Sequence, residues 1–448
     1  MQPCVTSLAG QPASLWTRTA AAAKGRRGLS RAGEKIVAMA PTVGTSFLLV
    51  GITAAQAILL ARSLGPAARG EYAAAISYTR ILTFIGLLGA NFAIVRRAAL
   101  AEGNLVGISR AAVRLGALTG LGTMVVVSLL SLFALPPGKQ HLAWLAVLCA
   151  STLPWEHIRL NLMAVDQGSG RFRRFNAGRL VAAAALPLLL AGALVFGRLS
   201  VREATLLLIP ATLIGLAFRL AWSDDRRPWL AGKPATRVLA REGLPYATSV
   251  VASDLFNRFD TLLILWMANL TQQGYYAAAV PAVQLLVVAP EALALFAFNA
   301  GVKSKRTHDA RRMVWIAAAL LAFQVVAAVI YSLILGRLIT LVYGAAFQGA
   351  TRFAMILLPG QLFQGCTLVA DGYLRGHGKA GAGIRARAVG AIAMAGCAVF
   401  LYKPYGALAV PLAATAGNTV SALWIGAAIL RQTGWRPFWA ATAPDQTS

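Results

Sequence analysis

The sequence has few charged residues and very few acidic ones. Charged side chains make up 13% of its 448 residues, only 15 residues are Asp or Glu, and 58% are hydrophobic. Soluble globular proteins have about 25% charged and about 45–50% apolar residues. This composition excludes an ordinary water-soluble enzyme. It also excludes a disordered basic chain, because disordered chains have low hydrophobicity.

Motifs for soluble catalysis and for metal binding are missing as well. The four cysteines have no metal-ligand spacing and suggest no disulfide framework: Cys4, Cys149, Cys366 and Cys397. The chain has no Walker loop, and its glycine-rich turns follow apolar helical stretches rather than strands, so they are not dinucleotide sites. We therefore expect no metal, no cofactor and no enzymatic activity.

What the sequence does have is long apolar runs and a net charge of +27. A nucleic-acid partner would explain the charge but not the hydrophobicity, whereas a polytopic helical membrane protein explains both. Runs of about 20 apolar residues, the length that crosses a bilayer, occur twelve times. The predicted spans are 39–61, 72–95, 111–135, 142–165, 176–197, 201–222, 244–268, 275–299, 314–336, 352–374, 384–402 and 407–430.

The distribution of basic residues supports this count. With the N-terminus in the cytoplasm, 29 of the 42 Lys and Arg residues fall in cytoplasmic segments and 7 in outer loops, as the positive-inside rule expects. We predict a multi-pass membrane protein with both termini in the cytoplasm. The connecting loops are too short to form a folded soluble domain. None of the outer loops is as large as the one expected of a polysaccharide polymerase.

Two short motifs recur and predict a parallel internal repeat. Gly70-Glu71-Tyr72 opens span 2 and Gly274-Tyr275-Tyr276 opens span 8, an offset of 204; Gly168-Ser169-Gly170 follows span 4 and Gly376-His377-Gly378 follows span 10, an offset of 208. After six spans the chain is back on its starting side, so the halves would be parallel repeats. The predicted parts are a basic cytoplasmic tail with partial disorder (1–38), an N-lobe (39–222), a basic linker (223–243), a C-lobe (244–430) and a C-terminal tail (431–448).

Several motifs in this order resemble Wzx-type polysaccharide flippases of the multidrug/oligosaccharidyl-lipid/polysaccharide exporter superfamily. They are Leu64-Gly65-Pro66 with Gly70-x-Tyr72, Asn257-Arg258-Phe259-Asp260, Gly274-x-Tyr276, Val342-Tyr343-Gly344 and the Gly-x-Gly turn after span 10. The resemblance covers about residues 40–430. It implies an all-helical fold of two six-helix lobes in a V around a central cavity. It also implies transport of undecaprenyl-diphosphate-linked oligosaccharides by alternating access.

This resemblance implies particular partners. They are the lipid-linked oligosaccharide and membrane lipids, and they could include the polymerase and glycosyltransferases of the same pathway. We expect no nucleic acid. The product would be O-antigen, as in lipopolysaccharide, or capsule or exopolysaccharide.

Span 7 carries the most ionisable groups inside the membrane. Such groups are costly there and usually pair or line a cavity. Asp254 and Arg258 are four residues apart, and Asn257 and Asp260 are three apart, so each pair shares a helix face. One interpretation is a structural salt bridge. The other is a cavity face, where Arg258 and Asn257 bind an anion while Asp254 and Asp260 position the arginine or carry a coupling proton.

Span 2 adds Arg80, whose repeat equivalent is Gln284 in span 8. Arg80 either snorkels to the outer interface or faces the cleft, where guanidinium would bind a diphosphate by paired charge-assisted hydrogen bonds. Glu291, beside the kink candidate Pro290, is a possible proton carrier or a partner of Arg258. Gln56 and Asn91 are lesser cavity candidates.

Span 4 carries Glu156, His157 and Arg159. They could form a proton relay, since histidine titrates near neutral pH, but an intra-lobe Glu156–Arg159 salt bridge is the preferred interpretation. Asp371 in span 10 is predicted to pair with Arg375, four residues later.

Four other functions compete with the flippase. A cation-coupled multidrug antiporter of the same superfamily would have a more acidic or apolar cavity. A lipid II flippase usually has two further spans. A membrane glycosyltransferase or ligase would need a catalytic carboxylate on a sizeable loop. A scaffold for polysaccharide assembly would transport nothing.

Overall fold

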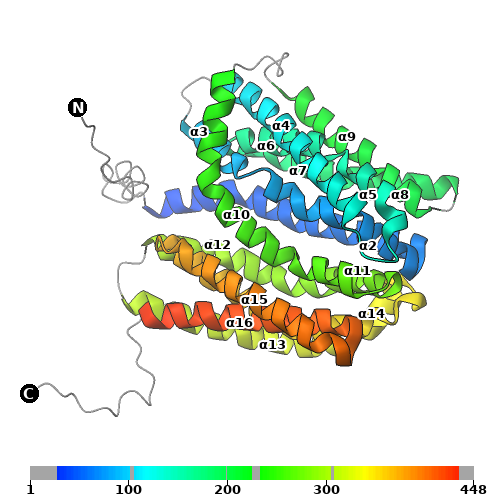
Figure 1. Ribbon diagram of the computed structural model, residues 1–448. Helices are drawn as coiled ribbons and strands as arrows, with labels where there is room; N and C mark the ends of the chain where they lie inside the picture. Colours follow the sequence, from blue (N-terminus) through cyan, green and yellow to red (C-terminus); the bar gives the residue numbers. More distant parts are fainter. Residues whose placement is uncertain (1–27, 101–104, 198, 224–232, 304–306, 433–448) are drawn as a thin grey trace, which may run out of the picture. The chain divides into compact units, whose positions relative to one another are not determined.

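The computed structural model describes residues 28–100, 105–197, 199–223, 233–303 and 307–432, and these residues form helices and turns with no strand (Figure 1). The chain divides into two units, Met1–Leu48 and Leu49–Ser448. The described part of the first unit is the beginning of helix α2, and the contacts discussed below lie in the second. Cys4 and the parts of the predicted tails and linker at 1–27, 224–232 and 433–448 lie outside the described residues.

The helices overlap all twelve predicted spans. Spans 1 to 6 lie on α2 (Gly28–Gly86), α3 (Ala90–Leu100), α4 (Leu105–Phe133), α5 (Ala143–Ala150), α6 (Leu153–Gly168), α7 (Phe172–Phe196), α8 (Val201–Leu206) and α9 (Leu208–Ala221). Spans 7 to 12 lie on α10 (Lys233–Met267), α11 (Leu270–Gln284), α12 (Val288–Lys303), α13 (Thr307–Tyr343), α14 (Ala350–Gly376), α15 (Ala380–Tyr405) and α16 (Ala409–Gln432).

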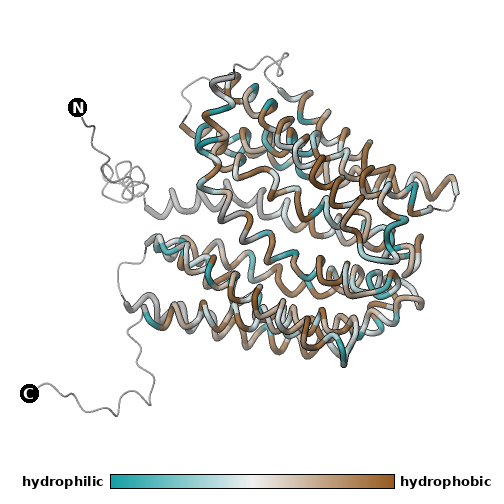
Figure 2. The backbone as a smooth tube through the Cα atoms, in the orientation of Figure 1, coloured by the Kyte–Doolittle hydropathy of each residue, from teal (hydrophilic) through white to brown (hydrophobic). Residues whose placement is uncertain are grey.

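Hydrophobic residues recur along most of the length of these helices (Figure 2). Among the described residues, eight helical segments are long and apolar enough to cross a membrane. Two of them, Gly44–Gly86 and Gly381–Arg431, each overlap two predicted spans. Predicted spans 142–165 and 244–268 are not among the eight. Their helices α6 and α10 carry the ionisable residues that make them candidates for function.

Two helices begin earlier than the predicted spans. Helix α2 begins at Gly28, inside the predicted tail 1–38, and α10 begins at Lys233, inside the predicted linker 223–243. In α10 the second residue is Pro234, and proline is favoured in the first turn of a helix. Hydropathy marks only the apolar part of a helix, so it misses a polar extension such as 233–243.

A break at Gly65 separates the first two predicted spans within α2. Gly65 has φ 73° and ψ 174°, outside the helical region, and Pro66 follows as the first residue of the next helical stretch. Proline is preorganised for that position, so Gly65-Pro66 ends one helix and starts another.

The two turns predicted to be repeats have the same hydrogen bonds. In the α6–α7 turn, Arg171 N donates to Asp166 O (2.8 Å), and in the α14–α15 turn Lys379 N donates to Leu374 O (2.9 Å). Both pairs are related by the offset of 208. The third residues of the two Gly-x-Gly motifs, Gly170 and Gly378, have φ of 73° and 77°, a conformation that costs other residues about 1–2 kcal/mol.

Several apolar clusters hold the helices of each lobe together, and some of them include residues of both lobes. Within the N-lobe α4 packs on α6 and α7 on α9, and within the C-lobe α12 packs on α14 and α15 on α16. The largest cluster lies in the C-lobe, around side chains such as Phe347 and Phe353, and it also takes in Ala57 and Ala61 from α2. Helix α2 therefore connects the cores of both lobes.

We expect Gly170→Ala and Gly378→Ala to destabilise the protein by similar amounts, about 1 kcal/mol each, because both turns need a left-handed residue. Gly192→Ala is the matched control, since an added methyl group there meets no atom within 4 Å and alanine favours the helix. Thermal unfolding of the purified variants in detergent would measure this. Clearly unequal losses at Gly170 and Gly378 would contradict the equivalence of the two turns, and an equal loss in Gly192→Ala would contradict the need for a left-handed residue there.

Candidate functional site

Two arginines from different lobes meet between α2 and α10. The Arg258 guanidinium carbon lies 5.9 Å from the centroid of the Phe84 ring on α2, and Arg258 is close enough to Arg80 for the two charges to repel each other. Arg80 is exposed and Arg258 half-buried. The sequence predicted both as substrate-binding residues, and the structure brings them together.

The carboxylates of α10 do not form an ion pair with Arg258. Asp254 and Asp260 attract the arginine electrostatically, but the salt bridges within the described part of the chain include neither of them. Asp260 instead accepts hydrogen bonds from Tyr276 Oη (2.5 Å) and Thr261 N (2.7 Å). These bonds attach Asp260 to its own lobe and replace the expected pairing with Asn257, whose side chain is exposed.

A third arginine, Arg69, extends the positive charge along α2. Its side chain is only 6% exposed, and its Nε and Nη1 atoms have no hydrogen-bond partner among the described residues. The guanidinium lies 5.5 Å from the Tyr72 ring centroid and repels Arg80. Arg69 lies between predicted spans 39–61 and 72–95, and therefore in a predicted outer loop. Its position directly before the Gly70-x-Tyr72 motif was the one signal that could have suggested a buried role.

The remaining polar candidates lie on α2, α11 and α12. Gln284 is the last residue of α11 and is exposed, Glu291 is exposed in the first turn of α12, and Gln56 is half-buried on α2. The predicted break beside Pro290 is present, because the three residues 285–287 form a 3-10 turn between α11 and α12. Glu291 and Arg258 form no salt bridge in the described part of the chain.

The charged residues of α6 bond within the N-lobe. Arg159 Nε donates to Glu156 Oε2 (2.9 Å), which confirms the preferred salt bridge. His157 is fully buried and its Nδ1 lies 3.1 Å from Thr119 Oγ1 on α4. Glu156 and His157 therefore have separate partners. In the C-lobe, the predicted Asp371–Arg375 pair is present (2.7 Å), and Arg387 joins it (2.7 Å).

At the predicted outer side, the two lobes touch through repeat-equivalent glycines. A methyl group on Gly70 would lie 1.7 Å from Leu270 O, and one on Gly274 would lie 1.9 Å from Pro66 O. Leu270 and Pro66 are themselves 204 residues apart. The contact is therefore reciprocal, as at a two-fold axis, and only glycine allows the backbones of α2 and α11 to approach this closely.

Basic side chains bridge the lobes beside these glycines. Arg62 Nε donates to Val342 O (2.8 Å), and Lys139 Nζ donates to Leu265 O (2.5 Å) and to Gln273 Oε1 (2.7 Å). Lys139 was predicted to lie in an outer loop, but its side chain is only 4% exposed. Burial lowers the pKa of Lys139 to about 8.

The lobes also touch at the predicted cytoplasmic side. Arg97 on α3 pairs with Glu242 on α10, and the hydrogen bonds from Arg97 lower the pKa of the Glu242 carboxyl. The rings of Phe92 and Tyr246 stack with their centroids 5.7 Å apart. Contacts therefore join the lobes on both sides of the arginine pair, and no sequence pattern had indicated those on the cytoplasmic side.

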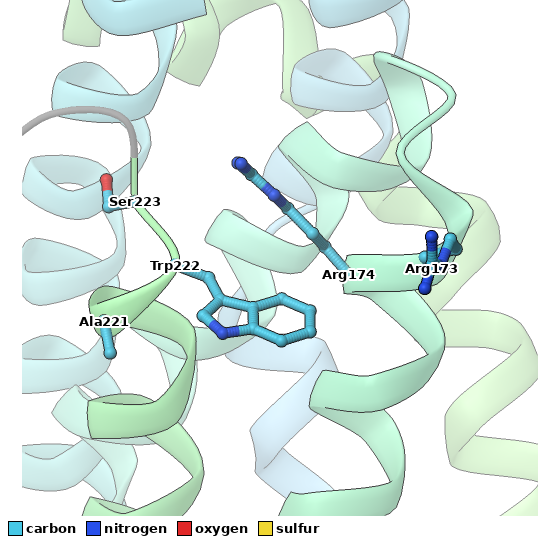
Figure 3. A pocket seen from close by; sticks show the side chains of 5 residues that line it. All are labelled: Arg173, Arg174, Ala221, Trp222 and Ser223. Atoms are coloured by element: carbon cyan, nitrogen blue, oxygen red, sulfur yellow. The ribbon is translucent and has the colours of Figure 1, made fainter.

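A separate basic pocket of about 540 Å³ lies at the ends of α7 and α9. Figure 3 shows Arg174 extending from α7 toward the side of the pocket that carries Ser223, above the indole ring of Trp222 in this view. Arginine and tryptophan are common where a helix leaves the membrane. We assign this pocket no role in transport.

Comparisons with known proteins agree with the helical architecture. Residues 43–298 match the model of a family described as "Polysaccharide biosynthesis protein". Among solved structures, the lipid II flippase MurJ in an inward closed conformation has 12% identity and a TM-score of 0.72, with 87% of this chain and 88% of that chain covered.

An inward-facing multidrug resistance MATE family transporter of the MOP superfamily has 14% identity and a TM-score of 0.66, covering 86% of this chain and 95% of that one. The eukaryotic MATE transporter AtDTX14 has 13% identity and a TM-score of 0.57, with coverages of 90% and 98%. A search of curated proteins finds no match. At these identities the structural neighbours establish the fold, and both kinds of transporter share it.

We expect Gly70→Val and Gly274→Val each to separate α2 from α11, because a side chain at either position collides with a backbone carbonyl of the other lobe. Spin labels on the predicted outer ends of the lobes should move apart in both variants. Gly51→Val is the control, since a methyl group there meets no atom within 4 Å. Unchanged label distances in both glycine variants would contradict the contact.

We expect the buried Lys139 to make stability rise with pH. Its folded pKa of about 8 lies below the ordinary value of lysine, so the folded state binds its proton less tightly than the unfolded state does. Stability therefore increases as pH rises above about 8 toward the ordinary pKa. Relative to Lys139→Gln, the wild-type melting temperature should increase between pH 7 and 10. Relative to the exposed-site variant Lys403→Gln, the wild-type melting temperature should not increase with pH in this way. Equal increases relative to both variants would contradict a lowered pKa of Lys139.

Proposed function

Because the chain belongs to the polysaccharide biosynthesis protein family, we propose that it flips undecaprenyl-diphosphate-linked oligosaccharide units across the bacterial inner membrane. The units would be those of O-antigen, capsule or exopolysaccharide. Transport would proceed by alternating access between the two lobes, with both chain termini in the cytoplasm. The observation that carries this proposal is that Arg80 and Arg258, from different lobes, lie close enough for their charges to repel each other.

A diphosphate suits this arrangement on electrostatic grounds. Two guanidinium groups that repel each other are stabilised by an anion between them, and guanidinium binds phosphate oxygens through paired, charge-assisted hydrogen bonds. Arg69 adds a third positive charge along the same helix. A substrate linked to a diphosphate would therefore bridge the lobes where their charges now oppose each other.

The alternative is a cation-coupled multidrug antiporter with the same fold. A site for cationic drugs needs carboxylates that are free to bind them. Asp260 is occupied by Tyr276 and Thr261, and this leaves Asp254 and Glu291 as the acidic candidates. In the flippase these two carboxylates would serve ion coupling, and Asn257, Gln284 and Gln56 would contact the polar parts of the substrate.

The decisive experiment measures the leaflet distribution of the lipid-linked oligosaccharide in cells. Deleting the gene should leave the oligosaccharide in the cytoplasmic leaflet. Wild-type protein should restore export, while Arg80→Ala and Arg258→Ala should each reduce it roughly ten- to hundredfold, since a hydrogen bond to a charged group contributes about 1.5–3 kcal/mol. Arg258→Lys should fall between, because it keeps the charge but loses the paired geometry.

Exposed Arg385→Gln is the matched control and should export normally at equal protein abundance. Normal arrival of the oligosaccharide in the outer leaflet without this protein would overturn the proposal. Export of a cationic dye that survives Arg258→Ala and is lost in Asp254→Asn would favour the antiporter.

A further inference from the structure

The repeat places a charge cluster in the C-lobe that is incomplete in the N-lobe. In the C-lobe, Asp371 is 3% exposed and pairs with Arg375 and Arg387, each at 2.7 Å. Gly383 makes room for the carboxylate, because a methyl group there would lie 1.9 Å from Asp371 Oδ1. The charge of the buried Arg387 on α15 is thus neutralised by the Asp371 carboxylate on α14.

The equivalent N-lobe residues, 208 positions earlier, keep the arginine and lose the carboxylate. Arg179 corresponds to Arg387, whereas Met163 stands in the place of the aspartate. The equivalent turns have the same hydrogen bonds, so the two helix pairs hold these positions in the same register. Arg179 forms no ion pair among the described residues; its guanidinium carbon lies 5.4 Å from the Phe175 ring centroid.

Where the C-lobe has its carboxylate, the N-lobe has a pocket. The pocket has a volume of about 560 Å³, and Met163, Phe175 and Arg179 line it together with Gln167 and Arg159. Arg159 is neutralised by Glu156, so Arg179 contributes one uncompensated positive charge. Most of the remaining wall is apolar and comes from α2, α3, α6 and α7.

We propose that this pocket binds an anionic glycerophospholipid, with the phosphodiester on Arg179 and acyl-chain carbons against the apolar wall. A phosphodiester carries one negative charge, which matches the one uncompensated arginine. A diphosphate carries more charge than Arg179 can neutralise, which distinguishes the ligand of this pocket from that of the arginine pair, although Phe84 borders both sites. The proposal does not depend on that function.

The depth of Arg179 fits a lipid headgroup. Arg179 lies seven residues after Phe172, the first residue of α7, which is about 10 Å along the helix. With its 25 residues, α7 is about 37 Å long, so it exceeds the hydrocarbon core of about 30 Å at both ends. The Arg179 backbone then lies about 7 Å inside the core boundary, and an extended arginine side chain reaches the phosphate layer from there.

Native mass spectrometry of the purified full-length protein with added phosphatidylglycerol tests this proposal. Wild type should retain phosphatidylglycerol, and Arg179→Gln should weaken that binding about tenfold. Met163→Asp should weaken it similarly, because it supplies the carboxylate that the C-lobe has. Met163→Asn has the same shape without the charge, so it should bind as wild type does and shows that any loss is electrostatic.

Three outcomes would overturn the proposal. Undiminished binding by Arg179→Gln would exclude the site, and equal losses in Met163→Asp and Met163→Asn would assign the effect to packing. Equal binding of phosphatidylethanolamine would remove the requirement for an anionic lipid. As a further arm, undecaprenyl diphosphate that binds more tightly than phosphatidylglycerol and depends on Arg179 would assign the pocket to the transport substrate instead.

Discussion

Charge placed among apolar helices must be compensated, and this requirement organises the polar residues of the protein. A buried charge without a partner costs several kcal/mol. Three carboxylates among the described residues are paired with arginines of the same lobe. The pairs are Glu156–Arg159, Asp166–Arg219 and Asp371–Arg387. Two sites hold arginines for which the described residues supply no salt bridge: Arg80 and Arg258 between α2 and α10, and Arg179 in the N-lobe pocket. These are the places where an external anion would supply what the chain does not.

The repeat fixes the backbone in both lobes and leaves the side chains free to differ. Gly70 and Gly274 meet reciprocally, and the turns around Gly170 and Gly378 share their hydrogen bonds. The repeat equivalent of Arg80 is the neutral Gln284, and the repeat equivalent of Asp371 is Met163. Met163 and Asp371 therefore differ in charge although the turns that follow their helices have the same hydrogen bonds. In the C-lobe the arginine Arg387 is neutralised by Asp371, whereas its N-lobe equivalent Arg179 has no carboxylate partner among the described residues.

The sequence predicted features that depend on local spacing and missed those that depend on contact between distant segments. Apolar runs located the spans, and spacings of three and four residues predicted the Glu156–Arg159 and Asp371–Arg375 pairs. Burial of Lys139 could not be predicted, because Leu265 and Gln273, its acceptors, lie more than 120 residues away. In the sequence, Tyr276 is recognisable only as part of a glycine-tyrosine motif. Tyr276 donates a hydrogen bond to Asp260. Helical spacing therefore predicts which residues of a helix share a face, but not which residues of other helices they contact.

The contacts between the lobes differ in kind from those within them. Breaking a buried ion pair costs about 3–5 kcal/mol, whereas an exposed pair contributes about 0–1 kcal/mol. The salt bridge between the lobes, Arg97–Glu242, is exposed on the arginine side, and the basic groups at the opposite end donate to backbone carbonyls and to an amide. Separating the lobes at either end would therefore leave no buried carboxylate without its partner. Movement of one lobe against the other, which alternating access requires, is compatible with this arrangement because the costly pairs remain intact inside each lobe.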